Sequence, residues 1–434
     1  MKNLFLLLLG IISIVVSCTK VENHSSSLNA SPNVSNAYYL NKFGYISNKS
    51  YNNATPSTWP TTAYSLDRVH SVLQAKNLGV AYYRMAMTQT LWNQGGTAQQ
   101  TYRDSSLKEF ITAQVTNGLK VVLNLNNETD PAPLTHNNFP TGTALTTYKN
   151  FVINVLDSCN KKGAYPYMVV VENEEDNANN FNLTTRQQCL DYANELAAAK
   201  TVCDGRSIIC TNGGLIARRL IDATYYNAIA SGTSTLTALK TWAYSVLPNN
   251  YYYGLIDTAA IPSGYTKYSA SATSQQISID DTLMHFYDSV AHLTYINIHW
   301  YEPQRAASWT EDKNNNQTPY VSLFGRPATD PDKAVPGGIA PVMQLLAGKF
   351  PGATIISNEV GQMNISTCLA TSLCGLINTN FAFGVLYGGD SQNDPVYGAK
   401  SYYSNLSTAT YSRRITGDAV NTWITSSGAI TQCP

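Results

Sequence analysis

Two short segments of the sequence each end a run of apolar, β-branched residues in an Asn–Glu pair. The first is VVVENEED, which contains Asn173 and Glu174, and the second is TIISNEVG, which contains Asn358 and Glu359. Such runs are typical of strands buried on both faces of a parallel sheet. Two carboxylates delivered by two strands can act together, one as proton donor and one as nucleophile, in the hydrolysis of a glycosidic bond.

Further polar side chains stand where other predicted strands end. Arg84 lies in AYYRMAM, and IHWYEP supplies His299 and Tyr301. A buried Arg needs a carboxylate partner, so we expect Arg84 to lie beside Glu359 and to lower the pKa of that carboxyl. A less solvated Glu174 would keep its proton and serve as the acid.

The elements that must position these residues alternate between strands and helices, which favours an α/β fold with parallel strands. Strands are predicted at 43–46, 80–85, 120–125, 167–171, 207–211, 293–300, 353–358 and 381–387, and helices at 66–76, 107–117, 148–161, 186–201, 339–350, 366–378 and 418–424. This tally predicts a closed (β/α)8 TIM barrel, whose catalytic groups collect at the carboxyl ends of the strands. An open doubly wound sheet is the alternative, but no glycine-rich phosphate-binding sequence follows the first strand.

The length of 434 residues exceeds that of a typical barrel. The stretch from Leu215 to Val290 contains helical segments and a piece rich in Tyr, Gly and Ser, and no linker brackets it. We therefore predict a single barrel domain over residues 36–434, with a βα-loop insertion at about 215–290. This loop and the polar loop at 302–338 are expected to form the walls of the cleft.

The first residues are predicted to be a lipoprotein signal peptide over residues 1–18. The apolar stretch from Leu4 to Val16 follows Lys2 and is too short for a transmembrane helix. It ends in VVSC, which resembles a bacterial lipobox and implies lipid attachment at Cys18; an ordinary cleaved signal peptide is the alternative. Polar residues 19–35 would form a flexible tether. The expected location is the bacterial cell envelope, lipid-anchored to the outer membrane on its periplasmic or surface side.

The composition narrows the classes of ligand. Charged residues make up 13% of the chain and the net charge is zero, so no basic field is present to hold nucleic acid. The 29 tyrosines suit a neutral carbohydrate, which binds by stacking and hydrogen bonds. We expect a polysaccharide or oligosaccharide substrate and no cofactor. No Cys/His group has zinc-binding spacing, so no metal site is predicted.

Taken together, the motifs resemble the large clan of retaining (β/α)8 glycoside hydrolases that includes cellulases, mannanases, xylanases and β-galactosidases. The resemblance implies that Glu174, at the end of the fourth strand, is the acid/base and that Glu359, at the end of the seventh, is the nucleophile. It implies that Asn173 hydrogen-bonds the sugar 2-hydroxyl and that Tyr301 holds the nucleophile ionised. It also implies that Arg84 lies near the nucleophile.

Two further residues complete the predicted substrate-binding set. His299 belongs to the clan's His–X–Tyr pattern at the end of the sixth strand, and Asn126, with Asn124, ends the third strand close enough to reach a sugar. The set of substrate-binding candidates is therefore Arg84, Asn126, Asn173, His299 and Tyr301.

The sequence departs from the clan at two strand ends. Proline usually follows Asn–Glu, but Glu175 stands there, and Glu172 and Asp176 make this end acidic. The acid/base therefore stays open among Glu172, Glu174 and Glu175; strand alternation would place Glu172 and Glu174 on one side and Glu175 on the other. The Trp that often ends the last strand is replaced by Tyr387 and two glycines.

These observations favour a retaining double displacement on β-linked glycosides or polysaccharides. The alternatives are a non-catalytic surface glycan-binding lipoprotein on a TIM-barrel scaffold, a barrel enzyme of another reaction class, and a structural envelope lipoprotein. The spacing of the two carboxyl groups separates two mechanisms, because retention needs about 5–5.5 Å and inversion needs about 6.5–9.5 Å.

Overall fold

The computed structural model describes residues 42–46, 62–127, 139–177, 181, 183–217, 219–220, 223, 274–302, 340–362, 377, 380–387, 417–418, 421 and 424. The chain divides into two units, Met1–Tyr38 and Tyr39–Pro434, and every described residue belongs to the second. The predicted signal peptide, Cys18 and the tether therefore lie outside the described residues, as does most of the predicted helix at 366–378. Within the described ranges, no helix is long and apolar enough to cross a membrane.

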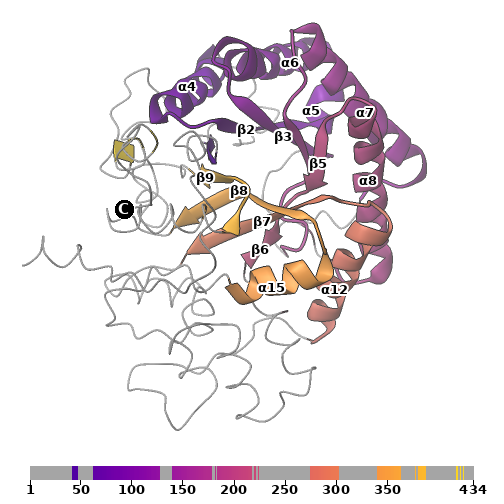
Figure 1. Cartoon of the computed structure of the whole chain (residues 1–434). Helices are drawn as coiled ribbons and strands as arrows, with labels where there is room; N and C mark the ends of the chain where they lie inside the picture. The colour runs from indigo at the N-terminus through magenta and orange to yellow at the C-terminus, as the bar shows by residue number, and fades with distance from the viewer. Residues whose placement is uncertain are drawn as a thin grey trace, which may run out of the picture. The chain divides into compact units, whose positions relative to one another are not determined.

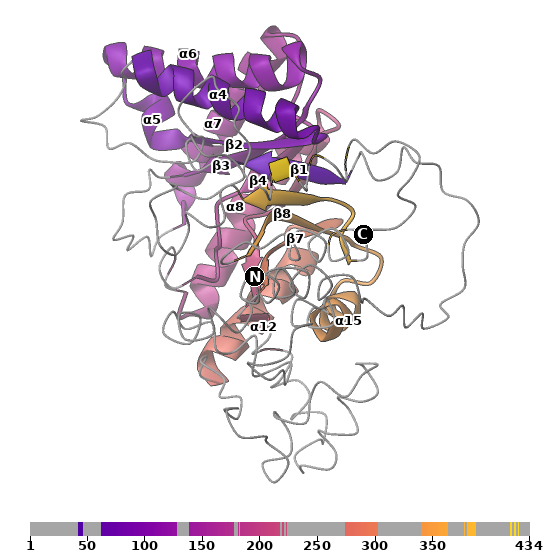
Figure 2. The same cartoon turned by 90° about the vertical axis from the view of Figure 1, so that its left-hand side faces the viewer.

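In the described part of the second unit, parallel strands are flanked by helices (Figure 1). The strands are β1 (Phe43–Ile46), β2 (Tyr82–Thr88), β3 (Lys120–Asn126), β4 (Met168–Val171), β5 (Ile209–Asn212), β6 (Leu215–Ile216), β7 (Tyr295–Glu302), β8 (Thr354–Gln362) and β9 (Gly384–Tyr387). The helices are α4 (Thr62–Leu78), α5 (Gln89–Asn93), α6 (Gly96–Phe110), the π-helical η2 (Ile111–Thr116), α7 (Gly142–Lys161), α8 (Arg186–Asp204), α12 (Ser274–Ser289) and α15 (Ala340–Lys349). Helices α4 and α6 lie on one side of the strands, and α12 and α15 lie on the other (Figures 1 and 2).

The nine strands form one sheet in the order β5-β4-β3-β2-β1-β9-β8-β7-β6. Strand β5 pairs with β4, and β6 pairs with β7, but only Gly213 and Gly214 separate β5 from β6 in sequence. The two are therefore halves of a broken fifth strand. The Asn212 side chain bonds to the backbone of Asn297 across the break. The predicted (β/α)8 TIM barrel is confirmed, with its fifth strand divided.

Both ends of the predicted insertion at about 215–290 belong to the barrel itself. Strand β6 pairs with β7, and α12 packs beside α8. Helix α12 joins the core through apolar residues at helical spacing, among them Leu283, Phe286 and Tyr287. An insertion between β6 and α12 is therefore shorter than the predicted range, and its residues 224–273 lie outside the described part of the chain.

Side chains along each strand alternate between the barrel interior and the surrounding helices, and the interior face changes from apolar to polar toward the carboxyl end. Alternate residues such as Val121, Leu123 and Leu125 of β3 belong to the large apolar cluster that includes the helices, whereas Val122 belongs to a small cluster inside the barrel. Two residues after an inner apolar position, the same face becomes polar. These steps are Tyr82 to Arg84, Val122 to Asn124, Tyr295 to Asn297 and Ile356 to Asn358. The carboxyl end of the barrel interior is thus polar, and this is the end where TIM barrels carry their active sites.

A buried ion pair joins α4 to α6. The Arg68 Nε atom lies 2.5 Å from Glu109 Oε2, and the two side chains are 1% and 0% exposed. The variant Arg68→Met leaves the Glu109 charge buried without its cation, so we expect the free energy of unfolding in urea to fall by about 3–5 kcal/mol. The exposed pair of Lys200 and Asp204 on α8 is the control, because Lys200→Met should cost less than about 1 kcal/mol. Equal losses in both variants would contradict this account.

Candidate active site

Arg84 is buried at the carboxyl end of the barrel and joins four strand ends. Its Nη1 lies 2.5 Å from Glu359 Oε2 and donates to the Asn358 carbonyl at 3.1 Å, both in β8. Its Nη2 donates to Asn173 Oδ1 at 2.7 Å, and its Nε donates to Asn124 Oδ1 at 3.0 Å. Arg84 therefore lies beside Glu359, as expected from the sequence, and also orients the amide that precedes Glu174.

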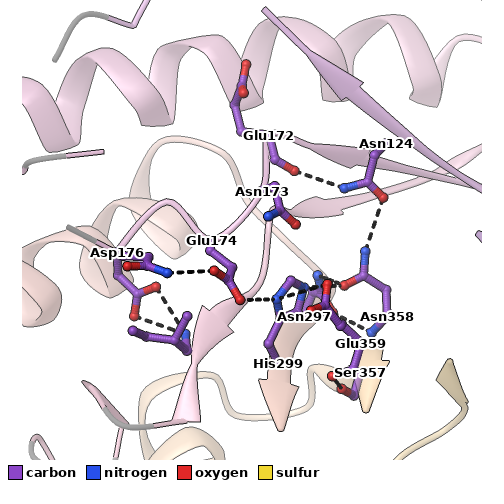
Figure 3. Close-up of polar contacts among 12 residues, drawn as sticks. Asn124, Glu172, Asn173, Glu174, Asp176, Asn297, His299, Ser357, Asn358 and Glu359 are labelled. Carbon is purple, nitrogen blue, oxygen red and sulfur yellow. Dashed lines mark hydrogen bonds and ion pairs between the residues drawn. The ribbon is translucent and has the colours of Figure 1, made fainter. Parts of the chain in front are cut away.

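Glu174 and Glu359 approach each other around His299 (Figure 3). The His299 Nδ1 atom lies 3.0 Å from Glu174 Oε1 and 3.7 Å from Glu359 Oε2. One oxygen of each carboxylate and one ring nitrogen all lie within 4.8 Å of one another. Asn177 donates from Nδ2 to the other Glu174 oxygen at 2.7 Å. The structure thus brings together two carboxylates that are far apart in sequence, each with its own polar partner.

Solvation does not distinguish the two carboxylates, contrary to the expectation of a less solvated Glu174. The side chain of Glu174 is 17% exposed and that of Glu359 is 13% exposed. Their partners differ instead, because a permanent cation, Arg84, holds Glu359 and a titratable imidazole, His299, holds Glu174. The electrostatic asymmetry of the site therefore comes from Arg84 and His299.

His299 is buried, and its protonation depends on its carboxylate neighbours. Burial lowers the pKa of His299, but the charge of Glu359 and the hydrogen bond and charge of Glu174 raise it more, so the net pKa lies above the ordinary value of 6.5. A raised folded-state pKa means that the stabilisation by the charged ring is complete below the unfolded pKa and is lost as pH rises through the folded pKa.

This shift predicts a pH-dependent difference between the wild type and His299→Gln. The free energy of unfolding of the wild type should exceed that of the variant most at acidic pH, with the difference shrinking as pH rises above 6.5. Denaturant titrations between about pH 5 and pH 9 measure the difference. A difference that widens toward alkaline pH would refute the assignment.

The acidic segment after β4 does not follow strand alternation, so the predicted placement of Glu172 and Glu174 on one side is wrong. Strand β4 ends at Val171, and both Glu172 and Glu174 have left-handed backbone, with φ of 62° and 50°. The Glu172 carboxylate points away from Glu174 (Figure 3) and accepts from the Asn127 backbone at 2.6 Å. Two left-handed residues at one strand end store backbone strain, which is common at functional sites.

Glu175 is also turned away from the centre. It is fully buried and accepts from Asn212 Nδ2 at 2.8 Å and from the Tyr287 hydroxyl. Burial raises the pKa of this carboxyl, although both hydrogen bonds act against the increase. Of the three candidates for the acid/base, only Glu174 faces His299 and Glu359.

The broken fifth strand lets the backbone pass close to His299. A Cβ atom at Gly214 would lie 2.3 Å from the His299 ring, and Gly214 has φ of +118°. Gly214→Ala should therefore destabilise the fold by about 1–3 kcal/mol, with loss of any activity that depends on His299. Gly118→Ala is the matched control, because Gly118 also has positive φ (+68°) but its Cβ would meet nothing within 4 Å. Urea denaturation and activity assays should show that only Gly214→Ala changes the site; equal effects would contradict this.

The three facing side chains, Glu174, His299 and Glu359, are also the group among the described residues that could hold a metal ion. However, the Arg84 guanidinium lies 2.5 Å from Glu359 Oε2, so a cation already neutralises that carboxylate. A second cation in contact with the same carboxylate would meet the repulsion of Arg84. We interpret the group as one that moves protons.

The remaining predicted substrate-binding residues are Asn126 and Tyr301, and the structure describes the side chain of the first but not of the second. Asn126 ends β3, and its Oδ1 has no hydrogen-bond partner among the described residues; Asn124, two positions earlier, contacts Arg84 instead. Tyr301 pairs with Gly361 between β7 and β8, but its side chain lies outside the described residues. The sequence interpretation missed Asn297 and Asn358 as functional residues. The step from apolar to polar on each strand's inward face is the signal that could have identified them.

No protein-family model matches the chain, and no curated protein matches it in sequence. Among solved structures, the chain is similar to the virulence factor SghA, crystallised with its substrate analogue salicin, at 11% identity, 91% coverage of this chain, 99% of that chain and a TM-score of 0.50. It is also similar to the hyperthermophilic β-glucosidase from Pyrococcus furiosus at 10% identity, 90% and 96% coverage and a TM-score of 0.53. A GH5_18 protein from Bifidobacterium longum subsp. infantis matches at 11% identity, 89% and 79% coverage and a TM-score of 0.50.

This likeness shows the fold. One of these neighbours is named a β-glucosidase, and the sequence identities of about a tenth leave the chemistry of this chain to be argued from its own side chains.

Proposed function

We propose that the protein is a glycoside hydrolase that cleaves β-linked glycosides or polysaccharides with retention of configuration. The observation that carries the proposal is the approach of Glu174 and Glu359 to within 4.8 Å at the carboxyl ends of the barrel strands. This spacing, for one oxygen of each carboxylate, agrees better with the roughly 5–5.5 Å of retaining enzymes than with the roughly 6.5–9.5 Å of inverting ones. The fold shared with a solved β-glucosidase and with a protein that has the substrate analogue salicin supports the proposal.

In the first step, Glu359 attacks the anomeric carbon while Glu174 protonates the leaving oxygen, which yields a glycosyl-enzyme ester. Arg84 keeps Glu359 ionised and aligned, and Asn173, held by Arg84, is placed to bond the sugar 2-hydroxyl. In the second step, Glu174 removes a proton from water, and the water oxygen displaces Glu359. Over a full cycle, Glu174 gives one proton to the leaving group and regains one from water, and Glu359 forms and then loses one covalent bond to the sugar.

Two features of the sequence favour a glycan-binding role without catalysis, the acidic crowding around Glu174 and the absence of a Trp at the end of the last strand. The first of these observations carries less weight in the folded chain, because Glu172 accepts from the Asn127 backbone, Glu175 accepts from Asn212, and both point away from the centre. Only one carboxylate from this segment faces Glu359. The arrangement of the described residues therefore favours catalysis over binding alone.

A hydrolysis screen tests the proposal. The purified protein is incubated with a panel of β-linked polysaccharides and aryl β-glycosides in buffer with EDTA, and early products are examined by proton NMR at the anomeric position. We expect release of sugar whose first-formed anomer is β. An α-anomer would overturn retention, and binding without cleavage would favour the glycan-binding alternative.

We also propose lipid anchoring at Cys18, on the sequence VVSC that follows the apolar N-terminal stretch. In a bacterial host, the wild type should fractionate with the envelope membranes, and Cys18→Ser should release the protein or leave it unprocessed. Identical membrane association of the two forms would argue against the lipobox.

A further inference from the structure

Four asparagines link the strand ends beneath the two carboxylates. Asn124 of β3, Asn212 of β5, Asn297 of β7 and Asn358 of β8 are all fully buried, and we call them the asparagine network. Each amide side chain can present its oxygen or its nitrogen to a neighbour, and the choice depends on what that neighbour donates or accepts. The network ends at His299, whose own tautomer is decided in the same way.

Two members of the network have orientations that their partners dictate. The Asn124 oxygen faces Arg84 Nε, which can only donate, and the Asn124 nitrogen faces the Glu172 carbonyl, which can only accept. The Asn297 oxygen accepts from the Asn358 backbone N–H at 2.9 Å, and its nitrogen donates to the Asn212 carbonyl at 3.2 Å. Neither amide can flip without placing like groups face to face.

Asn358 lies between these two fixed amides. Its Nδ2 donates to Asn124 Oδ1 at 3.2 Å, and its Oδ1 accepts from Asn297 Nδ2 at 2.7 Å. The same Oδ1 lies 2.7 Å from His299 Nε2. Because an amide oxygen only accepts, Nε2 must be the ring nitrogen that carries a hydrogen. His299 Nδ1, at 3.0 Å from Glu174 Oε1, then has no hydrogen in the neutral ring.

We propose that the asparagine network holds His299 in the Nε2–H form, so that His299 Nδ1 and Glu174 Oε1 share a single proton. Asn358 is then a positioning residue for the acid/base step, acting through His299. The catalytic part of this inference rests on the proposed function, whereas the tautomer assignment does not. The shared proton belongs to the pair of side chains and not to either one alone.

The shared proton gives Glu174 both of its roles. In the first step, the glycosidic C–O bond breaks, its electron pair goes to the leaving oxygen, and the proton follows. The bare Nδ1 lone pair of His299 then faces the Glu174 carboxylate, which favours recapture of a proton. In the second step that proton comes from the attacking water, so the pair is restored without another reactant.

The charged groups around His299 come from three other segments. The carboxylates of Glu174, after β4, and Glu359, in β8, lie at 3.0 and 3.7 Å from Nδ1 and favour a proton there. Arg84 of β2 opposes that proton by its charge. The buried Glu175, which follows Glu174 in the sequence, also interacts with the charge of His299.

The tautomer can be read directly by nitrogen NMR. The full chain, labelled with ¹⁵N-histidine, contains only 6 histidines, and His299→Gln identifies the signal that belongs to His299. We expect Nε2 to remain protonated across the titration and Nδ1 alone to change. A neutral His299 with its hydrogen on Nδ1 would overturn the inference, and this result would stand whether or not any sugar is hydrolysed.

The role of Asn358 is tested with Asn358→Leu, which keeps the approximate shape and removes the acceptor. Hydrolysis of aryl β-glycosides with poor leaving groups, which need protonation, should fall by about 10²-fold or more. Hydrolysis of dinitrophenyl glycosides should fall much less. An equal loss of rate on both kinds of glycoside would indicate a displaced Glu359 and would overturn the role of Asn358 in the acid/base step. If the variant does not fold, the wild-type NMR titration still decides the tautomer. If the wild type cleaves nothing, the proposed function is refuted, and the tautomer assignment is still decided by the NMR titration.

Discussion

Glu359→Gln should lower kcat by about 10⁴-fold or more on every substrate that the wild type cleaves, because no covalent intermediate can form. Glutamine has nearly the shape of glutamate, so the site should remain assembled. The amide removes the negative charge opposite Arg84, which leaves a buried guanidinium without its carboxylate. We therefore expect some loss of stability together with the loss of activity, measured by initial rates and by urea denaturation on the same preparation.

The controls for this variant come from the acidic segment after β4. Glu172→Gln and Glu175→Gln keep an oxygen that can accept from Asn127 and Asn212, and both residues point away from the centre. Each should reduce kcat far less than Glu359→Gln does. Glu174→Gln should abolish the hydrolysis of substrates with poor leaving groups. If Glu172→Gln or Glu175→Gln proved as damaging as Glu174→Gln, the assignment of the acid/base would be wrong.

Arg84→Met should damage both folding and catalysis. It removes the cation of a buried pair and the donors to Asn124, Asn173 and the Asn358 carbonyl, so we expect a loss of about 3–5 kcal/mol in the free energy of unfolding. The uncompensated Glu359 would take up a proton more readily, so the acidic limb of the kcat/KM profile should move to higher pH.

Arg84→Lys separates charge from geometry. Lysine retains the positive charge near Glu359 but cannot reproduce the planar array of donors that spans four strand ends. We expect it to restore much of the pH profile and little of the rate. If Arg84→Met left both the unfolding free energy and the pH profile unchanged, the role of Arg84 as the centre of the site would be refuted.

The barrel could be predicted from the sequence because its strands are short apolar runs and its helices have helical spacing. For example, α7 was predicted at 148–161 and spans Gly142–Lys161, and β3 was predicted at 120–125 and spans Lys120–Asn126. Helix α5 and the start of α6 were missed, because their residues are mostly polar and give no clear periodicity. The break at Gly213 and Gly214 was also beyond pattern analysis, since it depends on the close approach of the His299 ring.

The candidate site shows the same contrast between what local sequence patterns indicate and what only the folded chain decides. The local sequence, together with its resemblance to the glycoside hydrolase clan, led to Glu359, Arg84 and His299 and to an acidic segment that includes Glu174. It could not choose Glu174 over Glu172 and Glu175, because left-handed backbone after Val171 replaces the strand alternation on which that choice relied. Nor could it reveal how Asn358 constrains His299, since that depends on amides from four strands. Such contacts exist only after the barrel closes, when strand ends that are far apart in sequence meet at one edge of the sheet.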